Sequence, residues 1–428
     1  MARRLGGYPA RKTQTLNNSF VFIINKHISM SNKKIFLLAT FVLSAAIVGG
    51  FAVTSVQSRD SGQLERKIVV YKEGVSDARG SEKIQKHGGL KMKHLRVVNA
   101  DAALLSKSAA ELLARDFDVL RVEDDVIVET SDRKTSASGR AAPAQPAQTL
   151  PWGIDRIDAD LVWGTTTGDP VKVAVIDTGI ELAHPDLKNN IKGSYNAIFP
   201  WKSANDDNGH GTHVSGIIAA ESNAIGVVGA GPQIDLYAVK VLGKNGSGYL
   251  SDVIEGIDWA IANGMQVVNM SLGTSSNIQS FHDAVVRANQ AGVVQVAAAG
   301  NSGLAVNYPG AYPEVIAVSA TDSTDTITSW SSRGPEVDLS APGNDIYSTY
   351  KGQTYRTLSG TSMASPHVAG AAALVLTQTV KCDADLSGTC SPAEVQNRLQ
   401  ATAIDLGIAG PDGLYGSGLV NAYNAVTQ

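Results

Sequence analysis

Residues 173–179 have the sequence Val-Ala-Val-Ile-Asp-Thr-Gly, in which four apolar residues lead into a carboxylate and a glycine. A short run of apolar, largely β-branched residues is typical of a strand buried on both faces, as in a parallel sheet. Ligands of open α/β sheets bind at the carboxyl ends of such strands. We therefore expect Asp177 at the edge of a sheet, where chemistry can take place.

The segments that follow Pro151 alternate between strand-like and helix-like patterns. We expect strands at 171–176, 236–241, 267–272, 293–298 and 315–320, helices at 252–262 and 281–290, and further helices that begin near His210 and Ser362. Alternation of this kind predicts a doubly wound α/β domain with a mainly parallel sheet. We assign this domain to residues 151–428.

Two further segments carry reactive side chains. Residues 208–216, Asn-Gly-His-Gly-Thr-His-Val-Ser-Gly, place His210 between two glycines ahead of an apolar stretch. Residues 360–370, Gly-Thr-Ser-Met-Ala-Ser-Pro-His-Val-Ala-Gly, place Ser362 at the start of a helix, where unpaired N–H groups favour a developing negative charge. Asp, His and Ser together make an acyl-transfer triad: Ser attacks, His carries the proton, and Asp holds the imidazole.

These three segments resemble the signatures of the subtilisin-like serine proteases. The resemblance implies that Asp177, His210 and Ser362 are catalytic, and that the Asn301 side chain and the Ser362 N–H form the oxyanion hole. It also implies a cleft lined by Ser247, Gly248, Tyr249, Leu250, Ser271, Leu272 and Gly273, with Ala298, Ala299, Gly300 and Asn307 at its first pocket. An extended peptide would pair with the cleft as an added strand. For the first pocket we expect medium-sized apolar or aromatic side chains.

Other function classes lack their motifs. The Gly-x-Ser-x-Gly elbow of lipases is absent around Ser362, and the sequence has no His-Glu-x-x-His run of a metal-dependent hydrolase. We interpret His213 and His367 as packing residues. A secreted binding protein that keeps the fold without the activity stays open as the alternative.

Charge is distributed unevenly along the chain. Its 428 residues are 43% hydrophobic and 18% charged, which is ordinary for a globular protein. Residues 1–57 carry seven basic and no acidic side chains, whereas residues 131–428 carry sixteen basic and twenty-seven acidic ones. An acidic catalytic part argues against nucleic acid as a partner and suits cations. We expect a monomer that acts on proteins and peptides.

The first 57 residues contain an export signal. Two lysines, Lys33 and Lys34, precede an apolar run over 35–48 that ends in small residues, which predicts secretion. Met30 is an alternative start that would give a conventional basic leader. A retained anchor is the other interpretation, because the apolar run carried through Val56 is about long enough to span a bilayer. We expect cleavage of the signal and no stable association with a membrane.

Residues 58–130 form a separate unit. We expect strands at 67–71, 95–98 and 119–130 and helices at 77–87 and 108–115, the β-α-β-β-α-β order of ferredoxin-like folds. The unit resembles the inhibitor-type propeptide of the same protease family, which implies that it assists folding and then blocks the cleft. Residues 131–150, rich in Ala, Ser, Pro and Gln, are predicted to be a linker. The resemblance implies self-cleavage after Thr130, with trimming toward Ala147.

Two calcium sites are expected. The two cysteines, Cys382 and Cys390, are expected to form a disulfide in an exported chain. The loop between them and the residues after it place Asp383, Asp385, Ser387, Thr389 and Glu394 at EF-hand spacing. The alternative is a polar turn that ends in a helix N-cap at Ser391. The resemblance implies another site made by Gln148, Asp186 and Asn223 with carbonyls near Glu221, Ile225 and Val227.

Overall fold

The computed structural model describes residues 63–131 and 145–428. The chain divides into a unit over residues 1–59 and a second over residues 60–428. The predicted export signal and linker residues 132–144 lie outside the described residues. Within the described parts, no helix is both long and apolar enough to cross a membrane.

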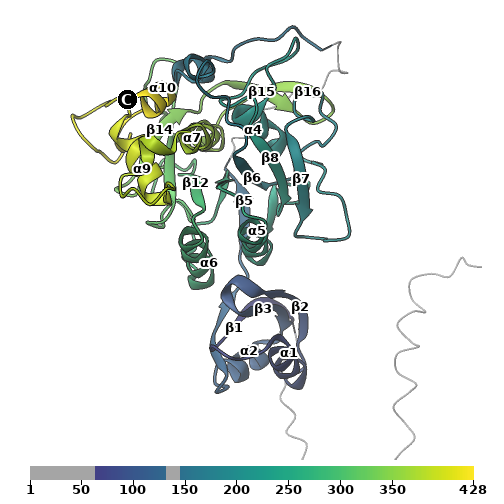
Figure 1. The fold of residues 1–428 in the computed structure, drawn as a ribbon. Helices are drawn as coiled ribbons and strands as arrows, with labels where there is room; N and C mark the ends of the chain where they lie inside the picture. Colours follow the sequence, from purple (N-terminus) through teal and green to yellow (C-terminus); the bar gives the residue numbers. More distant parts are fainter. Residues whose placement is uncertain (1–62, 132–144) are drawn as a thin grey trace, which may run out of the picture. The chain divides into compact units, whose positions relative to one another are not determined.

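A seven-stranded sheet forms the centre of the second unit (Figure 1). Its strands, in the order β14-β13-β12-β10-β6-β8-β7, are β14 (Leu339–Pro342), β13 (Ile316–Thr321), β12 (Val294–Ala298), β10 (Val267–Met270), β6 (Lys172–Asp177), β8 (Asp235–Lys240) and β7 (Ile191–Asn196). Every neighbouring pair is parallel. The predicted doubly wound α/β fold is therefore confirmed.

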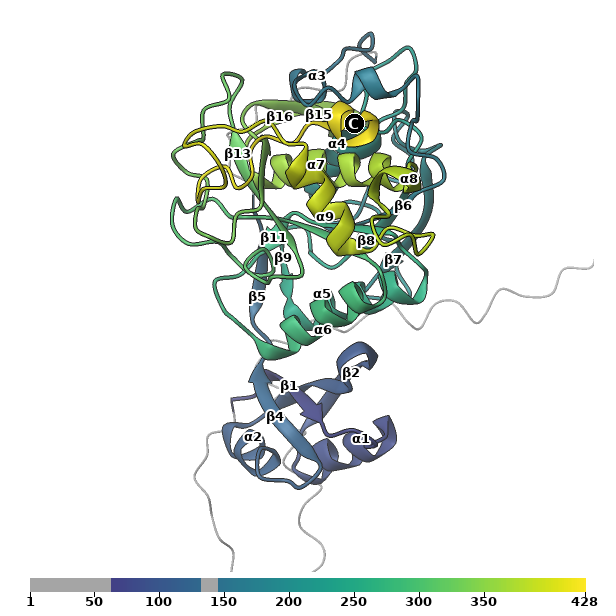
Figure 2. The ribbon, with the colours of Figure 1, turned by 60° about the vertical axis from the view of Figure 1, so that its left-hand side comes forward.

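Helices cover both faces of this sheet. The longer ones are α4 (His210–Ala219), α5 (Leu250–Ala262), α6 (Gln279–Gln290), α7 (Thr361–Leu376) and α9 (Pro392–Ala401), and the shorter ones are α3 (Trp152–Arg156), α8 (Thr379–Cys382) and α10 (Ala422–Thr427). Val173 and Val175 of β6 belong to the core that contains α4 and α7, whereas Ala174 and Ile176 belong to the core that contains α5 and α6. Figure 2 shows α7 on the side of the sheet opposite α5 and α6. Because α7 is buried along nearly its whole length, Ser362 starts from a rigid element.

The N-terminal part of this unit has a four-stranded antiparallel sheet in the order β2-β3-β1-β4. Its elements are β1 (Glu65–Tyr71), α1 (Asp77–Lys86), β2 (Leu90–Leu95), β3 (Ala100–Leu105), α2 (Lys107–Leu113) and β4 (Val119–Asp124). The strand expected at 95–98 is wrong. Residues Arg96–Val98 form a 3-10 turn that ends at Asn99 with a φ of 47°, and this turn joins β2 to β3. The polar edge strand β2 and the alanine-rich β3 lack the apolar alternation that marks a strand.

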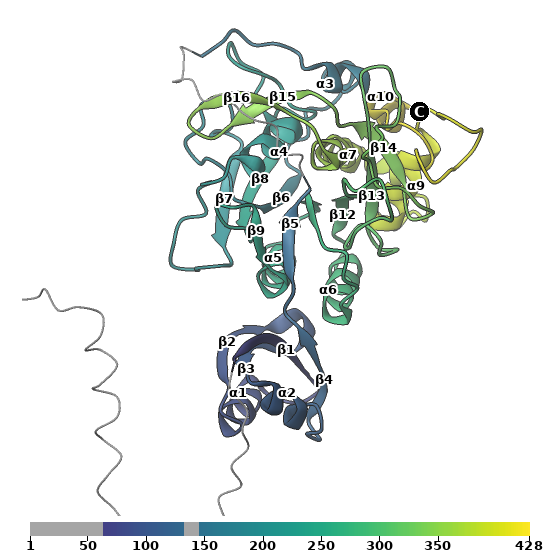
Figure 3. The same cartoon turned by 180° about the vertical axis from the view of Figure 1, so that it is seen from behind.

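After β4 the chain leaves the N-terminal sheet. The next strand, β5 (Ile127–Thr130), pairs antiparallel with both β9 (Ser247–Tyr249) and β11 (Leu272–Gly273). Figure 3 shows β5 alongside β9. The closing strands expected over 119–130 are thus β4 and β5, which pair with different partners. A separate hairpin is formed by β15 (Ile346–Tyr350) and β16 (Thr354–Leu358).

Candidate active site

Asp177 and His210 meet at the carboxyl edge of the central sheet. Asp177 is the last residue of β6 and His210 is the first of α4. The His210 Nδ1 lies 2.8 and 2.9 Å from the two carboxylate oxygens of Asp177, and both side chains are buried. Gly211 is required here, because a Cβ would lie 2.2 Å from the Gly179 carbonyl oxygen. A carboxylate that accepts from Nδ1 selects the tautomer whose Nε2 is the base.

Ser362 and Asn301 converge on one carbonyl oxygen. The Ser362 N–H donates to the Ser131 carbonyl at 3.2 Å, and the Asn301 Nδ2 donates to the same oxygen at 2.5 Å. The Asn301 Oδ1 accepts from Thr361 N–H at 2.9 Å and from its hydroxyl at 3.0 Å, which fixes the amide. The Ser362 Oγ donates to the Ser271 carbonyl at 3.1 Å. Two donors aimed at one carbonyl are the arrangement that stabilises a tetrahedral oxyanion.

The two predicted edge segments hold an extended peptide, and that peptide is the chain's own β5. Val128 pairs with Gly248, and Thr130 pairs with Leu272. The ladder continues to Ser131, whose N–H donates at 3.2 Å to the Ser271 carbonyl, the same oxygen that accepts from the Ser362 hydroxyl. Val128 is fully buried, in the core cluster that also contains Leu250 and Leu272. The structure therefore brings the predicted cleft residues together around residues 127–131.

Asn307 lies against both glycines that the sequence predicts to line the first pocket. A Cβ at Gly300 would lie 2.9 Å from the Asn307 Nδ2, and a Cβ at Gly273 would lie 3.1 Å from the Asn307 Cβ. The Asn307 N–H also donates to the Ala299 carbonyl at 2.9 Å. The Asn307 side chain thus lies against both expected walls of this pocket, the one from Ser271 to Gly273 and the one from Ala298 to Gly300.

Comparison with known proteins agrees with this geometry. The sequence profile of the Subtilase family matches residues 168–418. The chain belongs to the subtilase family. It is 41% identical over 409 residues to Subtilisin J of Geobacillus stearothermophilus, covering 92% of this chain and all of that one. It is 48% identical over 278 residues to Subtilisin Savinase of Lederbergia lenta, covering 64% and 98%, and 44% identical over 316 residues to an alkaline protease of Shouchella clausii, covering 73% and 77%. This subtilase is a serine endopeptidase.

The other two histidines near the site hold the subtilase scaffold together. The His213 Nε2 lies 3.0 Å from the carbonyl oxygens of both Ile346 and Arg356, to which it donates. The His367 Nδ1 lies 2.8 Å from the Met363 carbonyl oxygen, within α7. Burial lowers the pKa of His367 to about 4, so its ring is neutral at ordinary pH.

A cluster of oxygen ligands surrounds Asp186. The Asp186 carboxylate accepts from Asn223 Nδ2 at 2.8 Å and from Val227 N–H at 3.0 Å. The Gln148 amide lies against the carbonyl oxygens of Glu221 and Val227, at 3.0 and 3.4 Å from its Nε2. Burial raises the pKa of Asp186 to about 6. Half rotations of both the Gln148 and the Asn223 amides would turn their oxygens inward, which would give the hard oxygen set that Ca²⁺ prefers. The Ile225 N–H donates to the Asn223 Oδ1 at 2.7 Å and shapes the same loop.

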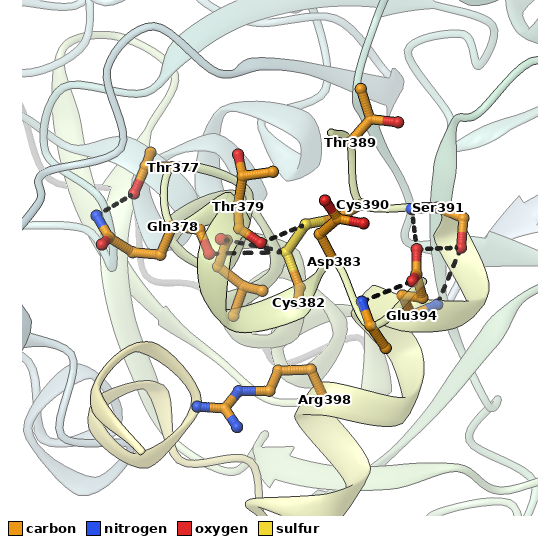
Figure 4. Close-up of a disulfide and its surroundings, with 12 residues drawn as sticks. Thr377, Gln378, Thr379, Cys382, Asp383, Thr389, Cys390, Ser391, Glu394 and Arg398 are labelled. Carbon is orange, nitrogen blue, oxygen red and sulfur yellow. Dashed lines mark hydrogen bonds between the residues drawn. A yellow bond between two sulfur atoms is a disulfide. The ribbon is translucent and has the colours of Figure 1, made fainter. Parts of the chain in front are cut away.

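The disulfide loop contains the other expected cluster (Figure 4). Cys382 and Cys390 are bonded, and carboxylate oxygens of Asp383, Asp385 and Glu394 lie within 4.8 Å of one another. Glu394, however, is already hydrogen-bonded. It accepts from Ser391 N–H and Oγ, both at 2.8 Å, and from the N–H groups of residues 384 and 385. These bonds, chiefly those from Ser391, lower the pKa of Glu394 to about 2.

The same loop also forms the alternative structure, a polar turn that ends in a helix N-cap at Ser391. Ser391 is the N-cap of α9 and forms a capping box with Glu394. Asp383 accepts from the N–H groups of Ser387 and Gly388, at 2.8 Å each. The Ser387 hydroxyl in turn donates to the Thr389 carbonyl at 2.9 Å. The turn is therefore held by its own hydrogen bonds, while its three carboxylates still lie close enough together to share a cation.

Sequence reasoning missed Ser131. The linker composition that begins at this residue gives no hint that its carbonyl reaches two donors far along the chain. The C-terminal end of the predicted linker is also more ordered than a linker composition suggests, because Ala147 and Thr149 form β-bridges with Ile225 and Val227. The predicted linker is thus attached to the folded domain at its carboxyl end.

Proposed function

We propose that the chain is a secreted, calcium-stabilised endopeptidase made as a self-processing zymogen, with Ser362 as the nucleophile. The observation that carries the proposal is the carbonyl of Ser131, which accepts hydrogen bonds from Ser362 N–H and Asn301 Nδ2 beside the buried Asp177–His210 pair. A peptide carbonyl in this position is presented to a serine with a base and an oxyanion hole at hand.

The proposed reaction is acyl transfer. The Ser362 Oγ attacks the carbonyl carbon while His210 takes its proton, and Asp177 stabilises the resulting imidazolium. The Asn301 amide and the Ser362 N–H stabilise the oxyanion. His210 then protonates the leaving amine, and water hydrolyses the acyl-enzyme by the same path in reverse. Main-chain pairing with 247–249 and 272–273 would admit extended substrates of varied sequence.

In this proposal residues 58–130 are the inhibitory propeptide. Besides β5, the Asp125 carboxylate supports the assignment, since it accepts from Ser251 N–H and Oγ at 2.8 and 2.9 Å at the start of α5. Glu123 accepts from Ser280 N–H at 3.1 Å at the start of α6. Carboxylates at helix N-termini bind both the free N–H groups and the helix dipole. The segment is thus anchored beside the cleft that it fills.

Calcium enters the proposal through the cluster around Asp186. Gln148, Asp186 and Asn223 with the carbonyls of Glu221 and Val227 would hold the ion, and its charge would neutralise the buried carboxylate. The ion stabilises the folded state by mass action and so slows self-digestion. The loop with Asp383 and Asp385 is the second candidate.

Casein hydrolysis by the full chain tests the proposal. We expect activity that is lost to background in Ser362→Ala and kept in Ser329→Ala, a matched change at an exposed serine outside the site. Circular dichroism would show that each variant is folded. A folded wild-type chain that leaves casein intact would instead support the rival, a secreted binding protein that keeps the fold without catalysis.

A further inference from the structure

We propose that the first processing event is hydrolysis of the peptide bond on the carboxyl side of Ser131, and that the pocket at this position selects small side chains. The inference rests on the proposed function and makes it specific to one bond. The resemblance to the family implies cleavage after Thr130, one residue earlier.

The hydrogen bonds define the reacting carbonyl. Both expected oxyanion donors, Ser362 N–H at 3.2 Å and Asn301 Nδ2 at 2.5 Å, contact the Ser131 oxygen. Thr130 lies one step back in the ladder, in register with Leu272 of β11. Its N–H donates to the Gly246 carbonyl at 2.9 Å. Thr130 is therefore bound as the residue before the one that reacts.

The register of β5 is locked at its other end. Asp125 accepts from Ser251 N–H and Oγ, and from Arg66 Nε at 2.8 Å. The Leu250 N–H donates to the Val126 carbonyl at 2.9 Å. A slip of one residue would turn the buried Val128 toward solvent and break the bonds to Asp125, because side chains in a strand alternate between faces. Cleavage after Thr130 would require that slip.

The pocket beside Ser131 favours a small residue. Ser131 is itself buried, with 8% of its surface exposed. Asn307 lies against both Gly273 and Gly300, which leaves no room for a Cβ at Gly300. We infer that a side chain much larger than Ser or Ala would meet the Asn307 amide, which lies against both of these walls. The proposal thus replaces the sequence-based expectation of medium-sized apolar or aromatic residues.

The chemistry balances without any co-reactant but water. The Ser362 Oγ bonds to the Ser131 carbonyl carbon, the carbon–nitrogen bond to the next residue breaks, and the Ser362 proton passes through His210 to the leaving nitrogen. Water then adds its hydroxyl to the acyl carbon and returns a proton to Ser362. The products are a chain that ends in the Ser131 carboxylate and a chain that begins at Asp132. The carboxylate stays within reach of both oxyanion donors, so the N-terminal product remains an inhibitor.

Self-processing of the full chain tests this assignment. Samples quenched in acid over a time course are analysed by intact mass and N-terminal sequencing, and both fragments of the first cut are identified. We expect the earliest pair to end at Ser131 and begin at Asp132. Ser131→Ala should keep this cut, and Ser131→Phe should slow it at least tenfold. Thr130→Phe, a matched change one residue earlier at a half-exposed position, should slow it less than Ser131→Phe does.

The outcomes separate this inference from the proposed function. If the first two fragments show cleavage between Thr130 and Ser131, or at any bond within 132–147, the assignment of the bond is wrong. Casein hydrolysis by the same sample would then still support the proposed protease activity. Faster processing of Ser131→Phe than of Ser131→Ala overturns the small pocket. A folded wild-type chain that neither processes itself nor cleaves casein would instead contradict the proposed function. Because the wild-type fragments identify the bond directly, a variant that does not fold leaves the test intact.

Discussion

Replacing Asp125 by Ala should loosen the N-terminal unit from the catalytic part. This carboxylate accepts from Ser251 N–H, Ser251 Oγ and Arg66 Nε, and its side chain is fully buried. The change leaves a guanidinium and a helix N-terminus without their anion. The Asp125–Arg66 pair lies within the N-terminal unit, so dissociation breaks only the two hydrogen bonds from Ser251. A hydrogen bond to a charged group contributes about 1.5–3 kcal/mol, which gives about 3–6 kcal/mol for the two. At the lower figure, the dissociation constant of the cleaved unit would rise about a hundredfold, since every 1.4 kcal/mol is tenfold.

The assay uses the processed full chain. A dilution series is equilibrated, and the fraction of active enzyme is read from peptide hydrolysis, which gives the dissociation constant of the N-terminal fragment. The neighbouring Asp124→Ala is the matched control. Asp124 pairs with Lys67 but is 67% exposed, so its loss should change the constant by no more than about fivefold, or 1 kcal/mol. Equal effects of the two changes, or a rise below threefold for Asp125→Ala, would refute the anchoring role of this carboxylate.

Three further predictions follow from charges and burial. Release of the N-terminal fragment should speed up with added NaCl, because salt screens the charges that become exposed as the two parts separate. The effect should be smaller in Lys93→Met, which lacks the pairs that Lys93 makes with Asp252 and Glu255, each at 2.5 Å; equal salt slopes would contradict this. Because His367 has a pKa of about 4 against 6.5 in the unfolded chain, its neutral form contributes stability above pH 6.5 that is lost as the pH falls toward 4, about 3 kcal/mol in all; urea unfolding of Ser362→Ala, with and without His367→Gln, should show that only the parent loses this share. A chelator should shorten the half-life at high temperature by removing roughly 3 kcal/mol, the linkage at a hundred times the dissociation constant, and Asp186→Asn should already be short-lived and insensitive to chelator.

The sequence was sufficient where one side-chain pattern dominates. The apolar run before Asp177 predicts a strand that is buried on both faces. Glycines just before His210 and Ser362 indicate that helices begin at these two residues. These features depend on neighbours in the chain, so the parallel sheet and the position of the reactive side chains could be predicted together. The same reasoning failed at Arg96–Val98, where an apolar pair sits in a tight turn rather than a strand.

The rest depends on contacts that no local pattern records. The contact of the Ser131 carbonyl with Ser362 N–H and Asn301 Nδ2 depends on the register of β5, and the distant contact of Asp125 with α5 sets that register. Glu394 fits both an EF-hand spacing and a capping box, and the sequence alone does not decide between them. The structure shows the capping box because Ser391 and the preceding N–H groups are all within reach of one carboxylate.

The central claim is that Ser362 is a nucleophile activated by His210, and covalent labelling measures this most directly. The processed chain would be treated with an organophosphorus reagent specific for activated serines, digested, and searched by tandem mass spectrometry. The account predicts one adduct, on Ser362, that forms in step with the loss of casein hydrolysis and does not form in His210→Ala. A fully labelled Ser362 with undiminished hydrolysis, or an adduct on another serine that tracks the loss of activity, would contradict it.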